Sequence, residues 1–280
     1  MKTKFSLLKI IYHFCVIAIG VLMIYPIAWM ISGSFKSSVE LLNSGLSLVP
    51  EKFYPLNYAT GWAGFGGITF GTFFAKSLIV CILATLFTVI SSSLIAFGFA
   101  RLRFPGRNFW FTIMLMTMML PGQILMIPQY VIFNKLGWIN TYYPLIIPHL
   151  GGSAFFIFLM MQFVQGLPYE LDEAAVIDGC SPYMTYLRVI LPLIGPSLVT
   201  TTVIQFYWKW DEFLSSLLYL SRVNKFTVSV AIKAFADASS TTDYGAMFAM
   251  STLSLIPVFL IFLFFNRFLI EGVATSGLKA

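Results

Sequence analysis

Charged residues are scarce in this 280-residue sequence. Asp, Glu, Lys and Arg make up only 10% of it, whereas hydrophobic residues make up 59% and the mean hydropathy is +0.87. A soluble globular protein carries roughly 25% charged residues, so the composition excludes an ordinary soluble domain. It predicts an all-α integral membrane protein with several spans and little else.

Cysteine and histidine are almost absent, with three and two copies respectively. Cys15 and Cys81 lie in apolar runs and Cys180 lies in a polar segment, so neither a disulfide framework nor a metal site is expected. His13 and His149 are isolated in the sequence. We expect both to be core or interface residues with satisfied hydrogen bonds, not metal ligands.

The sequence also lacks the motifs of two other mechanisms. It contains no Gly-x-x-x-x-Gly-Lys-Ser/Thr phosphate-binding loop, so no cofactor is expected in this chain and any ATP must be bound by another subunit. The proposed spans carry no Asp, Glu, Lys or Arg in their interiors, which argues against a proton-coupled carrier but not against a sodium site made of backbone carbonyls. A pore lined by amide, hydroxyl and aromatic groups suits a neutral, polyhydroxylated substrate.

Basic residues outnumber acidic ones, which gives a formal net charge of +6. They form no Arg/Lys stripe, so the expected partner is anionic membrane lipid and not nucleic acid. Two basic clusters set the orientation through the positive-inside rule: Lys2, Lys4 and Lys9 at the amino terminus, and Arg101, Arg103 and Arg107 in a short loop. Both clusters, and with an even number of spans both termini, are predicted to be cytoplasmic.

Uncharged stretches mark six candidate transmembrane helices in a single domain, residues 1–280. They cover about residues 10–32, 77–99, 109–127, 149–166, 189–208 and 245–266. The first could instead be a cleaved signal peptide, but its uncharged run is too long for one. Pro121 and Pro128 interrupt the third span, where a helix to about Leu120 is expected to give way to irregular structure. The short apolar run 214–220 is predicted to be a partly inserted helix.

The most polar, most helix-coded stretch between two apolar runs is residues 166–196. It begins with a Gly166/Pro168 break, and acidic residues then favour the first turn of a short helix. Gly179 permits a sharp turn, and Ser181 followed by Pro182 is typical of an N-cap and a first helical position. The code therefore predicts helix, turn, helix and membrane entry, and an ordinary interfacial loop would share it.

The spacing within this stretch is more specific. Glu173-Ala174-Ala175, three residues, Gly179, nine residues and then Val189-Ile190-Leu191-Pro192 resembles the EAA loop of ABC importer permeases, with Val189 at the usual Ile. The resemblance implies a type I ABC importer permease fold in which this cytoplasmic loop, residues 167–188, docks into a cleft of an ATPase. It assigns ATPase coupling to Glu173, Ala174, Ala175, Asp178, Gly179, Leu191 and Pro192.

Weaker matches resemble the smaller permease of the carbohydrate (maltose-type) importers. They are residues 99–107, 48–50 with 56–58, 208–213, and the tail 271–280, in which Ala280 replaces the usual Gly. The resemblance implies alternating access in a bacterial or archaeal cytoplasmic membrane. It also implies as partners a second homologous permease, an ATPase dimer that binds ATP and Mg, and an extracytoplasmic sugar-binding protein.

The Trp-rich segment supplies the candidates for the transport pathway. Trp208, Trp210 and Glu212 are interpreted either as the outer rim of the pathway or as an interfacial aromatic anchor. Two functions of other classes stay open. The chain could be a subunit of an unrelated membrane complex or channel, which would not purify with an ATPase. It could be a membrane enzyme, which would need an ionisable cluster that we do not find.

Overall fold

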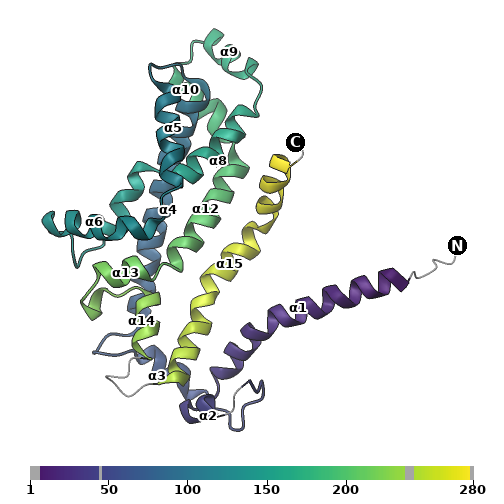
Figure 1. Cartoon of the computed structure of the whole chain (residues 1–280), viewed down its shortest axis with the longest axis vertical. Helices are drawn as coiled ribbons and strands as arrows, with labels where there is room; N and C mark the ends of the chain where they lie inside the picture. The colour runs from purple at the N-terminus through teal and green to yellow at the C-terminus, as the bar shows by residue number, and fades with distance from the viewer. Residues whose placement is uncertain (1–6, 44–45, 237–242, 278–280) are drawn as a thin grey trace. The chain divides into compact units, whose positions relative to one another are not determined.

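A computed structural model describes residues 7–43, 46–236 and 243–277 of the chain. The regular secondary structure of these residues is helical, apart from an isolated bridge between Phe65 and Ile68, and turns and loops connect the helices (Figure 1). The helices are α1 Leu7–Gly33, α2 Ser38–Asn43, α3 Leu56–Ala63, α4 Phe70–Arg101, α5 Arg107–Met118, α6 Gly122–Lys135, α7 Tyr143–Ile146, η1 Ile147–Gly151, α8 Ala154–Gln165, α9 Glu170–Ile177, α10 Pro182–Thr185, η2 Tyr186–Ile190, α11 Leu191–Leu193, α12 Gly195–Trp210, α13 Leu214–Tyr219, η3 Val223–Lys225, α14 Val228–Ala234 and α15 Tyr244–Gly277. The described part of the chain is therefore an all-α protein, as the composition predicts.

Four stretches of this chain are long and apolar enough to cross a membrane. They are Ile11–Gly33, Phe70–Arg101, Tyr143–Gln165 and Tyr244–Phe265. Two further helix pairs pass the same test together but are bent, Arg107–Met118 with Gly122–Lys135 by 101° and Pro182–Leu193 with Gly195–Trp210 by 76°. The described residues thus hold four candidate spans, or six when each bent pair is one span.

The expectation of irregular structure after Leu120 is wrong. The helix breaks only over residues 119–121, which end at Pro121 with an extended backbone (φ −60°, ψ 126°), and helix α6 begins at the next residue. Pro128 lies inside α6, where its missing N–H removes one helical hydrogen bond without ending the helix. The run that includes Leu214 is a helix, α13, as predicted.

The chain divides into two compact units, Met1–Gly71 with Ala231–Ile256 and Thr72–Val230 with Pro257–Ala280. In the first unit Asn57 is the central polar residue. Its buried side-chain amide donates to the carbonyls of Ser34, at 2.9 Å, and Lys36, at 2.7 Å. A Cβ at Gly245 would approach the Asn57 side chain to 2.6 Å, so the start of α15 can pack here only with glycine.

The second unit is organised around α4. This helix contributes to each of three hydrophobic clusters, through Val80, Phe97 and Ala96. Helix α8 contacts both α5 and α12. In Figure 1, α9 and α10 lie at one end of α8. Helix α13 follows the carboxyl end of α12, at Trp210. A displacement of α4 would therefore disturb these three clusters.

A buried polar seam joins α4 to its neighbours inside this unit. His149 Nδ1 lies 3.0 Å from Thr88 Oγ1 and 3.3 Å from Gln205 Nε2. The backbone N–H of Ser153 donates to Ser92 Oγ at 3.1 Å. The prediction that His149 is a core or interface histidine with hydrogen-bond partners is confirmed for its Nδ1.

Asn140 ties the α6–α7 connection to the segment after α13. Among the non-glycine residues that the structure describes, only Asn140 has a positive φ, which is 60°. Its Oδ1 accepts the N–H groups of Ser221, at 2.7 Å, and Arg222, at 3.1 Å, while its own N–H donates to the Tyr219 carbonyl at 2.8 Å. The Lys225 ammonium donates to its carbonyl. Asparagine tolerates this left-handed conformation better than most residues.

Candidate functional site

Helix α9 forms as the sequence predicts. Helix α8 ends at Gln165, and α9 begins at Glu170 with Asp172 and Glu173 also in its first turn. These carboxylates favour the helix because its amino end carries partial positive charge.

Gly179 ends α9 with a cap that fixes the direction of the chain. Its φ is +78°. The Gly179 N–H donates to the Val176 carbonyl at 3.0 Å, and the Cys180 N–H donates to the Ala175 carbonyl at 2.9 Å. This pair of bonds is the Schellman motif, which needs a left-handed residue where Gly179 stands. The prediction of a sharp turn at Gly179 is confirmed.

The second helix begins at Pro182, the predicted first helical position. Ser181 Oγ accepts the Met184 N–H at 3.3 Å, with Pro182 in the first turn, so the predicted cap is confirmed. The chain then passes through a π-helical turn, η2, and through α11 to the bend before α12. Tyr186 in η2 is buried, and its hydroxyl lies 2.7 Å from Ser93 Oγ of α4. This contact anchors the second helix to the bundle.

The two faces of α9 differ in exposure. Ala175 is 4% exposed, whereas Val176 is 68% and Ile177 is 85% exposed. Glu173, Ala174 and Asp178 are exposed as well. Thus the structure places five of the predicted coupling residues on or beside one short helix: four at its surface or turn, and Ala175 on the inward face.

Exposed apolar side chains occur on both α9 and α10, two short helices that contact each other. We define the α9–α10 surface as Glu173, Val176, Ile177, Tyr183 and Met184, all exposed. Contiguous exposed apolar side chains mark interaction sites in folded proteins. Only Glu173 was singled out from the sequence. The signal for the other four is a set of large apolar residues inside an otherwise polar loop.

Leu191 and Pro192 do not belong to this surface. They lie in α11, immediately before the 76° bend into α12. They therefore mark the junction between the loop and the apolar helix α12.

The three residues of the Trp-rich segment lie in three different environments. Trp208 is 48% exposed and packs on the rings of Phe155 and Phe156, with centroids 5.4 and 5.2 Å away. Trp210 is 9% exposed and stacks on Phe206 at 5.8 Å. Glu212 forms an ion pair with Lys209. Trp210 is therefore a core residue, and Trp208 is the aromatic residue of the pair that a partner or substrate could touch.

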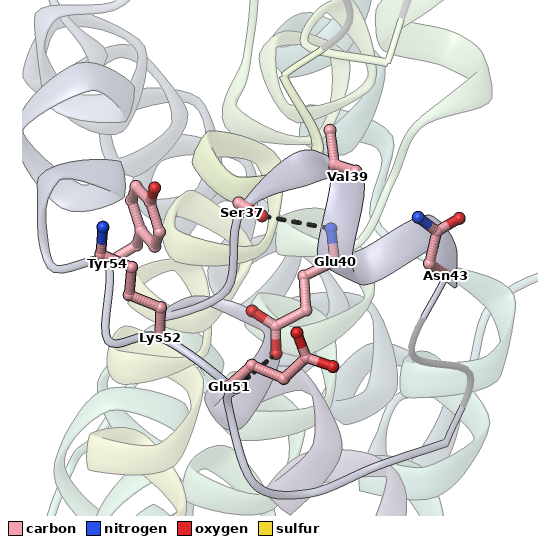
Figure 2. Close-up of a pocket in the computed structure, with 7 residues that line it drawn as sticks. All are labelled: Ser37, Val39, Glu40, Asn43, Glu51, Lys52 and Tyr54. Atoms are coloured by element: carbon pink, nitrogen blue, oxygen red, sulfur yellow. Dashed lines mark hydrogen bonds between the residues drawn. The ribbon is translucent and has the colours of Figure 1, made fainter.

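The first unit carries a separate pocket of about 370 Å³ (Figure 2). It is lined by Ser37, Val39, Glu40, Asn43, Glu51, Lys52 and Tyr54. Glu40 is satisfied from within the fold, because its Oε1 accepts the Glu51 N–H at 2.8 Å and lies 4.0 Å from Lys36 Nζ. None of the predicted site residues lines this pocket. Nowhere in the described residues do three or more His, Cys, Asp or Glu side chains gather closely enough to hold a metal ion.

Comparison with known proteins places this architecture. Residues 92–275 match the family of the binding-protein-dependent transport system inner membrane component. The probable ABC transporter permease YurM of Bacillus subtilis is 32% identical over 91% of this chain and 83% of its own length. The arabinooligosaccharides permease AraQ of Halalkalibacterium halodurans is 32% identical over 93% of both chains. The trehalose/maltose permease MalG of Thermococcus litoralis is 31% identical over 94% of both.

A solved structure shares the fold. A chain of a bacterial ABC transporter involved in the import of the acidic polysaccharide alginate superposes with a TM-score of 0.77, at 20% identity, over 95% of this chain and 98% of that one. The fold is thus the type I ABC importer permease fold expected from the EAA spacing. With its family match over residues 92–275 and relatives above 30% identity along nearly its whole length, the chain belongs to the family of binding-protein-dependent transport system inner membrane components, the permease subunits of ABC transporters.

Proposed function

We propose that this chain is a permease subunit of an ATP-driven importer for a sugar or oligosaccharide. It forms the translocation path with a second homologous permease, receives its substrate from an extracytoplasmic sugar-binding protein, and is driven by a cytoplasmic ATPase dimer that binds ATP and Mg. Relatives named for arabinooligosaccharide and trehalose/maltose transport support the substrate class. The α9–α10 surface is the observation that carries the coupling to an ATPase.

The geometry of the loop suits the transmission of a rigid-body motion. The Schellman bonds at Gly179 and the cap at Ser181 fix both sides of the turn, so α9 and α10 move as one stiff element. Val176 and Ile177 expose apolar area to water, which is unfavourable. Binding in a cleft of the ATPase would bury this area. Glu173, beside them, offers a carboxylate to a basic group of that cleft.

The orientation follows from charge. With Arg101, Arg103 and Arg107 in the cytoplasm, the α9–α10 loop, two spans further on, lies on the same side, as do both termini. A reporter that is active only in the cytoplasm is expected to be active when fused after Arg103 or Asp178 and silent when fused within residues 52–67. The opposite pattern would place the α9–α10 surface away from any cytoplasmic ATPase and end the coupling proposal.

The decisive experiment is purification of the whole complex in mild detergent followed by transport. We expect an ATPase and a second permease to co-purify. Proteoliposomes that contain the complex, ATP and Mg are expected to take up maltose or an arabinooligosaccharide only when the cognate binding protein is present. Recovery of the chain with other membrane proteins and no ATPase would instead support an unrelated membrane complex or channel.

A further inference from the structure

Arg101 makes contacts that its position in a basic loop does not predict. It is the last residue of α4, and its side chain is only 8% exposed, whereas Arg103, in the same loop, is exposed. A buried arginine needs partners, because an unpaired charge away from water is costly. The partners all lie in or just before α9.

Three different interactions hold the guanidinium group. Its Nε lies 3.0 Å from Asp172 Oδ2, an ion pair that lacks the alignment of a hydrogen bond. Its Nη2 donates to the Leu167 carbonyl at 2.8 Å. Its Cζ lies over the Tyr169 ring, 5.2 Å from the centroid, within the range of a cation–π interaction. One planar group thus contacts an acid, a carbonyl and an aromatic face, which a lysine ammonium could not do at once.

These contacts supply a lateral connection that the chain itself lacks. Along the chain, α9 is joined to the bundle through residues 166–169 at one end and through the Gly179 turn at the other. Helix α9 also packs against η2, and Arg101 adds an attachment from the first turn of α9 directly to α4. Because α4 enters the three hydrophobic clusters described above, a displacement of α9 held in this way reaches the core of the second unit.

We propose that Arg101 is a positioning residue for energy coupling: it clamps α9 to the end of α4, so that movement imposed on the α9–α10 surface is transmitted to α4. The inference rests on the proposed coupling of this loop to an ATPase. Asp172 is the matching half of the clamp. It lies on the inward side of α9 with Ala175, three residues further along and on the same helical face, so it is not available to an ATPase docked on the outward side.

The test uses the complete transporter complex in proteoliposomes with the sugar-loaded binding protein. The variants are Arg101→Gln, Arg101→Lys and the double variant Arg101→Gln/Asp172→Asn. Arg103→Gln is the matched control, because it removes the same charge from an exposed position in the same loop. Sugar taken up per ATP hydrolysed, ATPase co-purification and the melting temperature are measured for each variant.

We expect Arg101→Gln to lower sugar uptake per ATP by about tenfold, equivalent to ~1.4 kcal/mol, while the ATPase still co-purifies. Arg101→Lys keeps the charge but not the planar guanidinium with its several donors, so its uptake per ATP should fall less. Arg103→Gln should match the wild type. The double variant removes the unpaired buried carboxylate, so it should recover the melting temperature of the wild type without recovering uptake per ATP. Should Arg101→Gln fail to fold, Arg101→Lys and the double variant still decide the question.

Three results would overturn the clamp. One is uptake per ATP in Arg101→Gln equal to that of Arg103→Gln. Another is recovery of uptake in the double variant, since the defect would then be only an unpaired charge. The third is loss of ATPase co-purification together with transport, which would make Arg101 a docking or folding residue. A wild-type complex that recovers no ATPase refutes the proposed function itself and is thus distinguishable from these.

Discussion

Gly179 is the position at which a single substitution tests the stiffness of the α9–α10 loop. Its φ of +78° costs an L-residue about 1–2 kcal/mol, and β-branched valine is among the residues least suited to it. A Cβ at this position meets no heavy atom within 4 Å, so the cost of Gly179→Val is backbone strain and not a steric clash. One to two kcal/mol corresponds to a factor of roughly 5–30 in an equilibrium, and we expect the capped loop to be depopulated by that factor.

The assay is sugar uptake and binding-protein-stimulated ATP hydrolysis by the reconstituted complex. Gly67→Val is the matched control, because Gly67 has a φ of +73° and equally open surroundings but lies in the first unit, outside the α9–α10 loop. We expect Gly179→Val to lower both readouts and Gly67→Val to leave them near the wild-type level. Gly179→Asn should be much milder than Gly179→Val, since asparagine is the residue after glycine that best tolerates positive φ.

Two outcomes would refute this reasoning. Full uptake and full ATPase stimulation in Gly179→Val would show that the α9–α10 loop is not the coupling element. An equal loss in Gly67→Val would show that backbone strain anywhere in the chain impairs transport, so that the effect at Gly179 has no bearing on coupling.

Substitutions at four further positions follow from the structure. Glu173 is exposed, and a surface ion pair contributes only about 0–1 kcal/mol, so Glu173→Ala should reduce uptake less than Gly179→Val; a larger loss would mean that its partner on the ATPase is buried. Asn140→Ala removes the acceptor of the Ser221 and Arg222 N–H groups, so folding stability should fall by ~1–3 kcal/mol and the melting temperature in detergent should drop. Asn140→Asp keeps the acceptor and should lose less stability. Equal melting temperatures for Asn140→Ala and the wild type would contradict this prediction. Trp210→Ala empties a buried site and should cost ~3–5 kcal/mol, so the yield of folded protein should fall. Trp208→Ala, at a half-exposed site, should preserve folding and lower uptake; the reverse ranking of the two tryptophans would contradict their placement.

The sequence alone determines the local architecture of the coupling loop. The acidic first turn of α9, the turn at Gly179 and the Ser181 cap all depend on bonds that close within about five residues, so composition and spacing predict them. The all-α class and the candidate spans follow in the same way, because an apolar run long enough to cross a lipid bilayer can satisfy its backbone only as a helix. The EAA spacing also lies within one local segment of the chain, so it can be recognised in the sequence and identifies the family by resemblance.

The tertiary structure decides whatever depends on which distant side chains meet. Arg101 and Leu167 lie 66 positions apart, and no periodicity in the sequence indicates that they touch. Trp208 and Trp210 look equivalent in the sequence, yet they lie two residues apart on α12 and point to different surroundings, since successive helical positions are rotated by about 100°. The continuation of helix α6 through Pro128 is another such case, because the cost of a missing N–H is set by the packing around it and not by the proline itself. Local bonds therefore make the parts of this permease predictable, while burial and long-range contact select which of its side chains serve the core, the clamp or the exposed surface.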